Sequence, residues 1–254
     1  MTNHFPFERN IEMNTKALIA LAALSLSTIA SAQHADMLLI RDDAGNLLTG
    51  QYDFGTNQIV DTNTRVYEGE FDAFGTSDEP GFNALSSSNI PTGFQALDAN
   101  IAVSFDANTF QLGSASANLY HWDGNGAVDF SVSTNSLTIS KAPSAVFSAV
   151  LDGSDSNVEG FDIDTTSSDG FLHKHIDLAL ADFSASANGF YLWSLTIEAG
   201  GSSTDPIYFV HGFGIHNEPA HEAAIDWVNA NLVPAPGSLT ALLGLAAITT
   251  RRRR

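Results

Sequence analysis

Short apolar or alternating segments, separated by polar turns, occupy most of the chain. Clusters of Gly, Asn, Asp and Ser stand between these segments at intervals typical of strands joined by turns. Strands are expected at eight segments: 37–40, 101–105, 127–132, 136–139, 145–151, 176–183, 190–197 and 207–211. The 17 phenylalanines favour the core of packed sheets over a helical bundle. The pattern predicts an all-β fold, a β-sandwich or jelly roll.

One segment near the C-terminal end has helical spacing instead. Ala224, Val228 and Leu232 recur every fourth residue within 218–232, and acidic residues lie in the first turn. Asn217 precedes this segment and is expected to cap it. A short amphipathic helix is therefore expected after the last strand.

Residues 1–32 are interpreted as a leader and a signal peptide. Lys16 supplies a positive region, and an apolar run follows it. Small residues at 30–32 (Ala-Ser-Ala) then place a cleavage site before Gln33. Because the segment before Met13 is polar and irregular, Met13 is the expected true start, and the mature protein is expected to begin at Gln33.

The C-terminal end, 233–254, has the three parts of a sorting tail. A helix-breaking motif comes first, an apolar run follows, and an arginine cluster ends the chain. The motif is Val233, Pro234, Ala235, Pro236 and Gly237, and the cluster is Arg251, Arg252, Arg253 and Arg254. A basic end holds such a segment at the cytoplasmic face while the upstream domain lies outside. The alternative is a plain C-terminal anchor helix, which also leaves the protein at the envelope.

These boundaries leave 33–232 as a single β-sandwich domain. It contains no cysteine, so an exported chain must depend on its core rather than on disulfides. Four basic residues stand against 27 acidic ones, a formal net charge of −23 for this domain. Such a field repels nucleic acid, which is therefore excluded as a partner.

Histidine carries the candidate chemistry. His173 and His175 are expected to lie in a strand, where period-2 alternation places them on one face with Asp177. Two imidazoles and a carboxylate are ligands suited to zinc or another borderline divalent ion. His34 and Asp36 form a second same-face pair, and His34 can complete the site if its segment pairs beside this strand. The alternative interpretation is a solvated strand face.

Oxygen ligands gather in a second part of the chain, but without the spacing of an EF-hand. They are Asp152, Asp155, Asn157, Glu159, Asp162 and Asp164. A solvated acidic loop is the favoured interpretation, so calcium is a weaker candidate than zinc.

The tail resembles the PEP-CTERM sorting signal, in its VPAPG form: Ala235 stands where the family name records a glutamate. The remaining chain resembles exported PEP-CTERM proteins of planctomycete type, a group that includes zinc-repressor-regulated and surface-anchored proteins. Six segments carry this resemblance: 34–36 (HAD), 65–70 (RVYEGE), 78–82 (DEPGF), 169–175 (DGFLHKH), 189–192 (GFYL) and 221–224 (HEAA).

The resemblance implies an exported protein of the envelope, outer surface or extracellular matrix of a Gram-negative bacterium. An exosortase-type enzyme would process it during transient membrane contact through the terminal segments, and cell-surface polysaccharide or matrix is a candidate partner. The resemblance also implies a metal centre at His34, His173 and His175, with zinc favoured. Asp36 or Asp177 would then be a fourth ligand or an orienting group.

Two other functions stay open. In the first, the protein is a structural or adhesive component of the matrix, and its histidines are incidental. In the second, it is a copper oxygenase with a histidine brace, because His34 lies close to the mature terminus; this requires cleavage after Gln33, against the small-residue rule. No nucleophile or paired acid–base motif is found, so the sequence does not predict an enzyme.

Overall fold

The structure is a computed structural model, and it describes residues 36–53, 55–56, 58–215 and 217–234. The segment interpreted as a leader and signal peptide, His34 and the expected tail from Ala235 onward lie outside these residues. Within the described ranges, no helix is long and apolar enough to cross a membrane.

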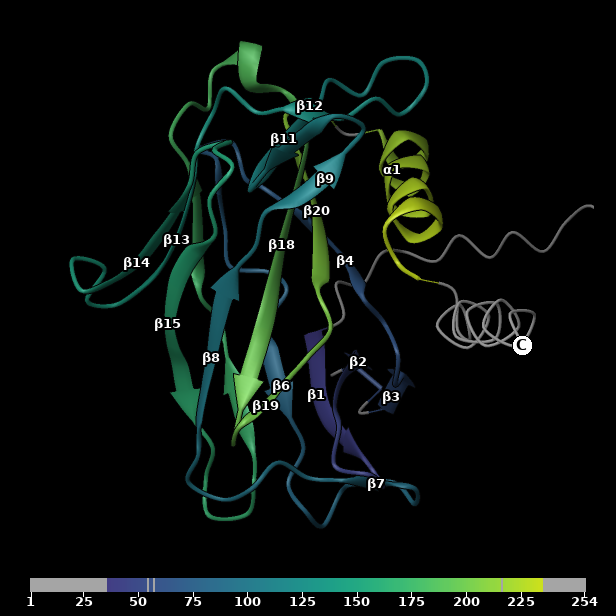
Figure 1. The fold of residues 1–254 in the computed structure, drawn as a ribbon, viewed down its shortest axis with the longest axis vertical. Coiled ribbons are helices and arrows are strands. Elements are labelled where there is room, and N and C mark those ends of the chain that lie inside the picture. The colour runs from purple at the N-terminus through teal and green to yellow at the C-terminus, as the bar shows by residue number, and fades with distance from the viewer. Residues whose placement is uncertain (1–35, 54, 57, 216, 235–254) are drawn as a thin grey trace, which may run out of the picture. The chain divides into compact units, whose positions relative to one another are not determined.

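The strands form four sheets (Figure 1). The six-stranded sheet has the order β16 (Leu172–Lys174), β6 (Phe82–Ala84), β1 (Asp36–Asp42), β2 (Leu47–Asp53) and β3 (Gln58–Asp61), with β7 (Phe94–Gln95) beside β1. The eight-stranded sheet has the order β12 (Ser131–Val132), β11 (Leu119–Trp122), β18 (Gly189–Ala199), β20 (Ile207–Phe213) and β4 (Val66–Glu70). Three more strands complete it: β8 (Ala102–Ala107) and β19 (Ser202–Ser203) pair with β18, and β15 (Val158–Thr165) pairs with β8.

The four-stranded sheet has the order β14 (Phe147–Leu151), β13 (Leu137–Lys141), β17 (Asp177–Leu180) and β5 (Thr76–Ser77). The remaining sheet pairs β9 (Phe110–Leu112) with β10 (Ala115–Ala117), and a 3-10 turn spans Ala185–Ala187. Among the described strands the pairing is antiparallel except between β1 and β6 and between β20 and β4.

The main core lies between the eight-stranded sheet and the six- and four-stranded sheets. Trp193 of β18, Leu39 of β1 and Leu178 of β17 belong to one buried cluster, so side chains from all three sheets meet there. This is the arrangement of a sandwich, in which each sheet buries one face against the opposing layer. The predicted all-β, sandwich-like fold is confirmed.

The helix α1 (Glu218–Asn231) covers the other face of the eight-stranded sheet (Figure 1). Its Ala224 and Val228 pack in a second buried cluster with Phe190 of β18 and Val210 of β20. The predicted helix is therefore confirmed to within one residue at its end. Asn217 is the N-cap residue, but its side chain makes no capping hydrogen bond.

The acidic segment expected to be a solvated loop differs most from the prediction, because part of it forms the strand β15. Glu159, Asp162 and Asp164 lie on β15, which pairs with β8 through two register shifts, so they are not part of a loop. The acidic alternation of β15 looks like a solvated loop when only hydrophobicity is considered. In the segment expected at 127–132, only the last two residues form a strand, β12.

Candidate metal centre

Three adjacent strands of the six-stranded sheet bring distant parts of the chain together. The central strand β6 pairs with β1 on one side and with β16 on the other. Asn83 of β6 lies opposite Leu38 of β1 and opposite His173 of β16. Asp36, at the start of β1, is therefore held two strands away from His173.

Asp36, His173 and His175 converge on one point. The Nε2 atoms of His173 and His175 are 3.2 Å apart, and Oδ2 of Asp36 is 3.1 Å from Nε2 of His173. One ligand atom from each residue lies within 4.8 Å of the others. The carboxylate is buried, whereas each imidazole is about one-third exposed. We call these three residues the metal centre.

The hydrogen bonds of His175 leave one ring nitrogen available for a metal. Its Nδ1 lies 2.8 Å from the backbone carbonyl of Asp78, so the N–H on Nδ1 donates to that oxygen. The lone pair then stands on Nε2, where it accepts a hydrogen bond of 3.2 Å from Nε2 of His173, and a metal ion can take the place of that proton. A backbone carbonyl bound to the distal N–H is the usual way in which a protein orients a metal-binding histidine.

The carboxylate of Asp36 is satisfied on one oxygen only. Its Oδ1 accepts a hydrogen bond of 3.1 Å from the backbone N–H of Gly81. Its Oδ2 is buried and makes no hydrogen bond, although Nε2 of His173 lies 3.1 Å from it. A buried oxygen without a hydrogen bond is costly in a folded protein, and a cation beside it would remove that cost.

Gly81 provides the space in which the ligands meet. A Cβ atom at this position would lie 2.7 Å from Nε2 of His175 and 2.9 Å from Oδ1 of Asp36. Both distances are shorter than van der Waals contact, so any side chain here would push the two ligands apart. The glycine is needed for this close approach.

The segment from Asp78 to Gly81 serves the metal centre through its backbone. Besides the Asp78 carbonyl, the carbonyl of Gly81 accepts a hydrogen bond from the N–H of Met37 on β1. The carbonyl of Glu79 lies 2.9 Å from Nε2 of His211, whose Nδ1 accepts a hydrogen bond from the indole of Trp193. The fully buried His211 thus ties this segment to the core of the eight-stranded sheet.

A second acidic group shares His175 but is less suited to a metal. Asp78, Glu79 and His175 also lie within reach of one another, with Oε1 of Glu79 3.9 Å from Nδ1 of His175. That nitrogen already donates to the Asp78 carbonyl, so Asp36 and His173 are the better partners. Burial raises the pKa of Glu79, and the charges of Asp36 and Asp78 add to this rise while His175 opposes it.

The structure does not bring Asp177 to the metal centre. The chain leaves the six-stranded sheet after Lys174 and enters the four-stranded sheet at Asp177, with Ile176 buried between them. The expectation of one continuous strand through 173–177 is therefore wrong: His173 lies on β16, His175 follows the end of that strand with its ring still beside His173, and Asp177 begins β17. His34 lies outside the described residues, so its place relative to these ligands is not described.

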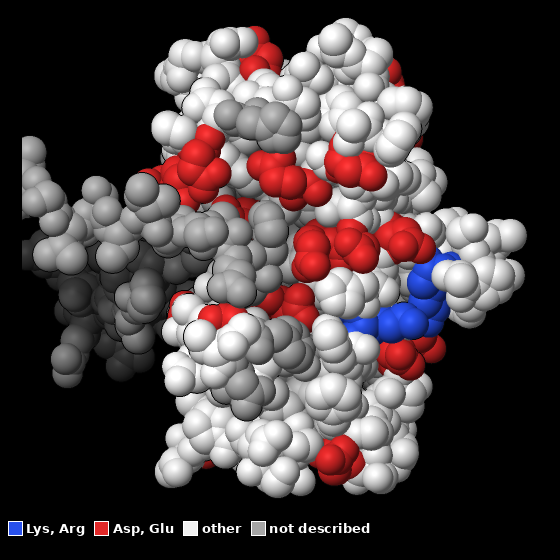
Figure 2. Space-filling view, turned by 180° about the vertical axis from the view of Figure 1, so that it is seen from behind, with Lys and Arg blue, Asp and Glu red and all other residues white. Residues whose placement is uncertain are grey.

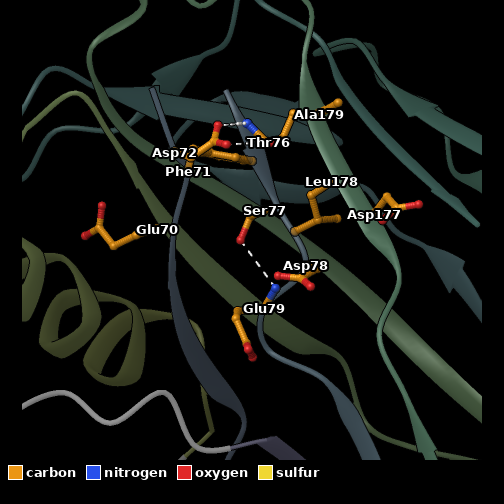
Figure 3. Close-up of a pocket in the computed structure, with 10 residues that line it drawn as sticks. All are labelled: Glu70, Phe71, Asp72, Thr76, Ser77, Asp78, Glu79, Asp177, Leu178 and Ala179. Carbon is orange, nitrogen blue, oxygen red and sulfur yellow. Dashed lines mark hydrogen bonds between the residues drawn. The ribbon is translucent and has the colours of Figure 1, made fainter. Parts of the chain in front are cut away.

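Asp177 instead lines an acidic cleft of about 720 Å³ (Figure 3). Five of its ten lining residues are acidic: Glu70, Asp72, Asp78, Glu79 and Asp177. Figure 3 shows that Glu70 and Asp177 point to opposite sides, and Asp72 accepts hydrogen bonds from Thr76 and Phe74 of its own turn. Acidic side chains also far outnumber basic ones on the face in Figure 2. The cleft belongs to this general acidity, and of its lining residues only Asp78 and Glu79 belong to a group of possible metal ligands, which they form with His175.

Comparison with protein-family models, curated proteins and solved structures found no match. The fold and the site therefore define the class: an all-β, sandwich-like protein with a His/Asp group that can hold a metal ion.

Proposed function

We propose that this chain is an exported envelope or surface protein that binds one divalent ion, zinc in preference, at Asp36, His173 and His175. The spacing of the ligand atoms carries the proposal. In a tetrahedral site with ligands about 2.0–2.1 Å from zinc, neighbouring ligand atoms lie roughly 3.3 Å apart. The separations of 3.2 and 3.1 Å at the metal centre match that value.

The kind of ligand also favours zinc over calcium. Calcium takes six to eight oxygen ligands, whereas two of the three groups here are imidazoles. Two nitrogens and one carboxylate are a common zinc set with an open coordination position, and non-haem iron uses the same donors. His34, two residues before Asp36 in the sequence, is a candidate for the open position. We propose zinc, and competition between zinc and iron(II) for the site decides between these two metals.

Calorimetric titration of the full chain, purified without a histidine tag, tests the metal proposal. We expect close to one zinc ion per chain, bound more tightly than calcium or manganese. The affinity is expected to fall in acidic solution, because imidazole binds a metal only in its neutral form. If no divalent ion binds, the matrix-protein interpretation gains and the metal proposal fails.

Export is proposed from the terminal segments and is tested separately. Protein recovered from the envelope or cell surface is expected to begin at Gln33, and processing by an exosortase-type enzyme is expected to remove Arg251 to Arg254. Mass spectrometry of both ends checks this. An intact Met1 or Met13 on surface material would contradict signal cleavage, whereas an intact arginine cluster would contradict only the processing of the tail.

A further inference from the structure

Asn83, at the centre of β6, is a buried amide without a partner. Its side chain is fully buried, and neither Oδ1 nor Nδ2 makes a hydrogen bond. Buried side-chain amides are nearly always hydrogen-bonded, and each exception calls for a physical reason. Asn83 lies beside a second exception, the unbonded Oδ2 of Asp36 on the neighbouring strand.

The register of the sheet places Asn83 on the same face as the metal centre. Residues directly opposite each other on paired strands have their side chains on the same face, so Asn83 shares a face with His173 and with Leu38. Asp36 is two residues before Leu38 on β1 and therefore also lies on this face. Gly81, two residues before Asn83, has no side chain to stand between the amide and the ligands.

The other neighbours of Asn83 on this face are mostly apolar, and the hydroxyl of Tyr52 is the polar group among them. Leu38 belongs to a small apolar cluster with Ile40, Tyr52 and Leu85. The ligand side offers more polar atoms than this cluster does, because it contains the carboxylate of Asp36 and the imidazoles of His173 and His175. An ion held by these ligands would give the amide oxygen of Asn83 a partner.

We infer that Asn83, rather than His34, is the fourth protein ligand of this metal centre and binds the ion through Oδ1. This inference rests on the proposed function. The donor set is then two nitrogens and two oxygens, and one of the oxygens is neutral. Because oxygen ligands suit harder ions, this set binds such ions better than the two histidines alone would. Asn83 then sets how strongly the site prefers zinc over manganese.

The test compares Asn83→Leu with the wild-type full chain in two measurements. Leucine has a similar shape and removes both unpaired atoms, so the metal-free protein, kept in a chelator, is expected to melt at the same or a higher temperature. Zinc affinity measured by calorimetry is expected to fall about tenfold, and manganese affinity to fall further. A polar group with a purely structural role would give the opposite pair of results, lower stability and unchanged affinity.

Two further variants make the outcome specific. Asn83→Asp keeps an oxygen at the same position and is expected to retain zinc binding. Ser194→Ala removes another buried polar atom without a partner, on β18 of the eight-stranded sheet, and is expected to leave zinc affinity unchanged. If Asn83→Leu does not fold, Asn83→Ala provides the same comparison.

Two outcomes separate the role of Asn83 from metal binding itself. If the wild type binds zinc and Asn83→Leu binds it equally well, Asn83 is not a ligand, but the metal centre stands. If the wild type itself binds no metal, the proposed function fails, and the role of Asn83 fails with it.

Discussion

Replacing His175 with alanine is expected to weaken zinc binding by about 100-fold or more. Loss of groups that only orient a ligand typically costs 10–100-fold, and loss of an imidazole ligand, a stronger zinc donor than the neutral amide oxygen of Asn83, costs at least the upper end of that range. His175 contributes the Nε2 atom that lies 3.2 Å from Nε2 of His173, so its removal leaves one imidazole and one carboxylate. Competition with a chelator of known zinc affinity measures the loss.

A matched histidine separates this effect from a general loss of imidazole. His121 of β11 is also partly buried, and its Nε2 lies 3.1 Å from the carbonyl of Asn188, away from the metal centre. His121→Ala is expected to bind zinc as the wild type does. His173→Ala should behave like His175→Ala, and His34→Ala shows whether the terminal histidine takes part. Wild-type affinity in both the His173 and His175 variants would place the ion elsewhere.

The pair His173 and His175 could be found from the sequence because its signal is local. Two histidines separated by one residue point together wherever the backbone is extended. Asp177 could not be placed in this way, because alternation along a strand says nothing about where the chain passes from one sheet to another. That passage occurs at Ile176, a buried residue that follows the last ligand.

The residues that support the ligands could not be predicted from the sequence pattern, for a different reason. Asp78 acts through its carbonyl and Gly81 through its lack of a side chain, so neither shows a metal-binding residue type in the sequence. Asn83 becomes notable only when its burial and its missing partners are known. The segment from Asp78 to Phe82 did stand out by resemblance, but not with any role.

The strands likewise differ in how far the sequence alone could predict them. β18 was predicted because both of its faces are buried: Phe190 and Leu192 face the helix side, while Trp193 and Leu195 face the main core. A continuous apolar run of this kind is a strong signal. β15 was not predicted, since much of it is exposed and acidic and its pairing with β8 is irregular. Its place is set by the neighbouring strand.

Replacing His221 with alanine is expected to destabilise the fold by about 2–3 kcal/mol in mildly acidic solution, which corresponds to a fall in Tm of roughly 5–10 °C. The imidazole lies on α1, almost fully buried, with its ring centroid 5.1 Å from that of Phe190. Its Nε2 lies 3.0 Å from the carbonyl of Val210, and its Nδ1 lies 3.0 Å from Oε1 of Glu70. Because both nitrogens face acceptors, both must carry a proton, and the folded state favours the imidazolium.

The balance of forces on this ring fixes the direction of the pH dependence. Burial lowers the pKa of His221, but the hydrogen bonds to Glu70 and to the Val210 carbonyl, with the charges of Glu70 and Glu68, outweigh it and raise the pKa above 6.5. A folded-state pKa above the unfolded value stabilises the fold fully below the unfolded value. That contribution is lost as the pH rises through the folded-state pKa.

The difference in unfolding free energy between wild type and His221→Ala is therefore expected to be largest below about pH 6.5 and to shrink toward pH 9. Denaturant titrations in the presence of a chelator measure it without a contribution from the metal centre.

His121→Ala is the control, and the pH dependence of its effect on stability is expected to run in the opposite direction. The reason is that burial lowers the pKa of His121 despite its hydrogen bond to Asn188 and the charge of Asp123. Glu70→Gln should reduce the pH-dependent part, though modestly, because the Glu70 side chain is 35% exposed and solvent screens the pair. Parallel stability curves for wild type and His221→Ala over this range would show that His221 is not held as an imidazolium, and the link between α1 and β4 would then rest on packing alone.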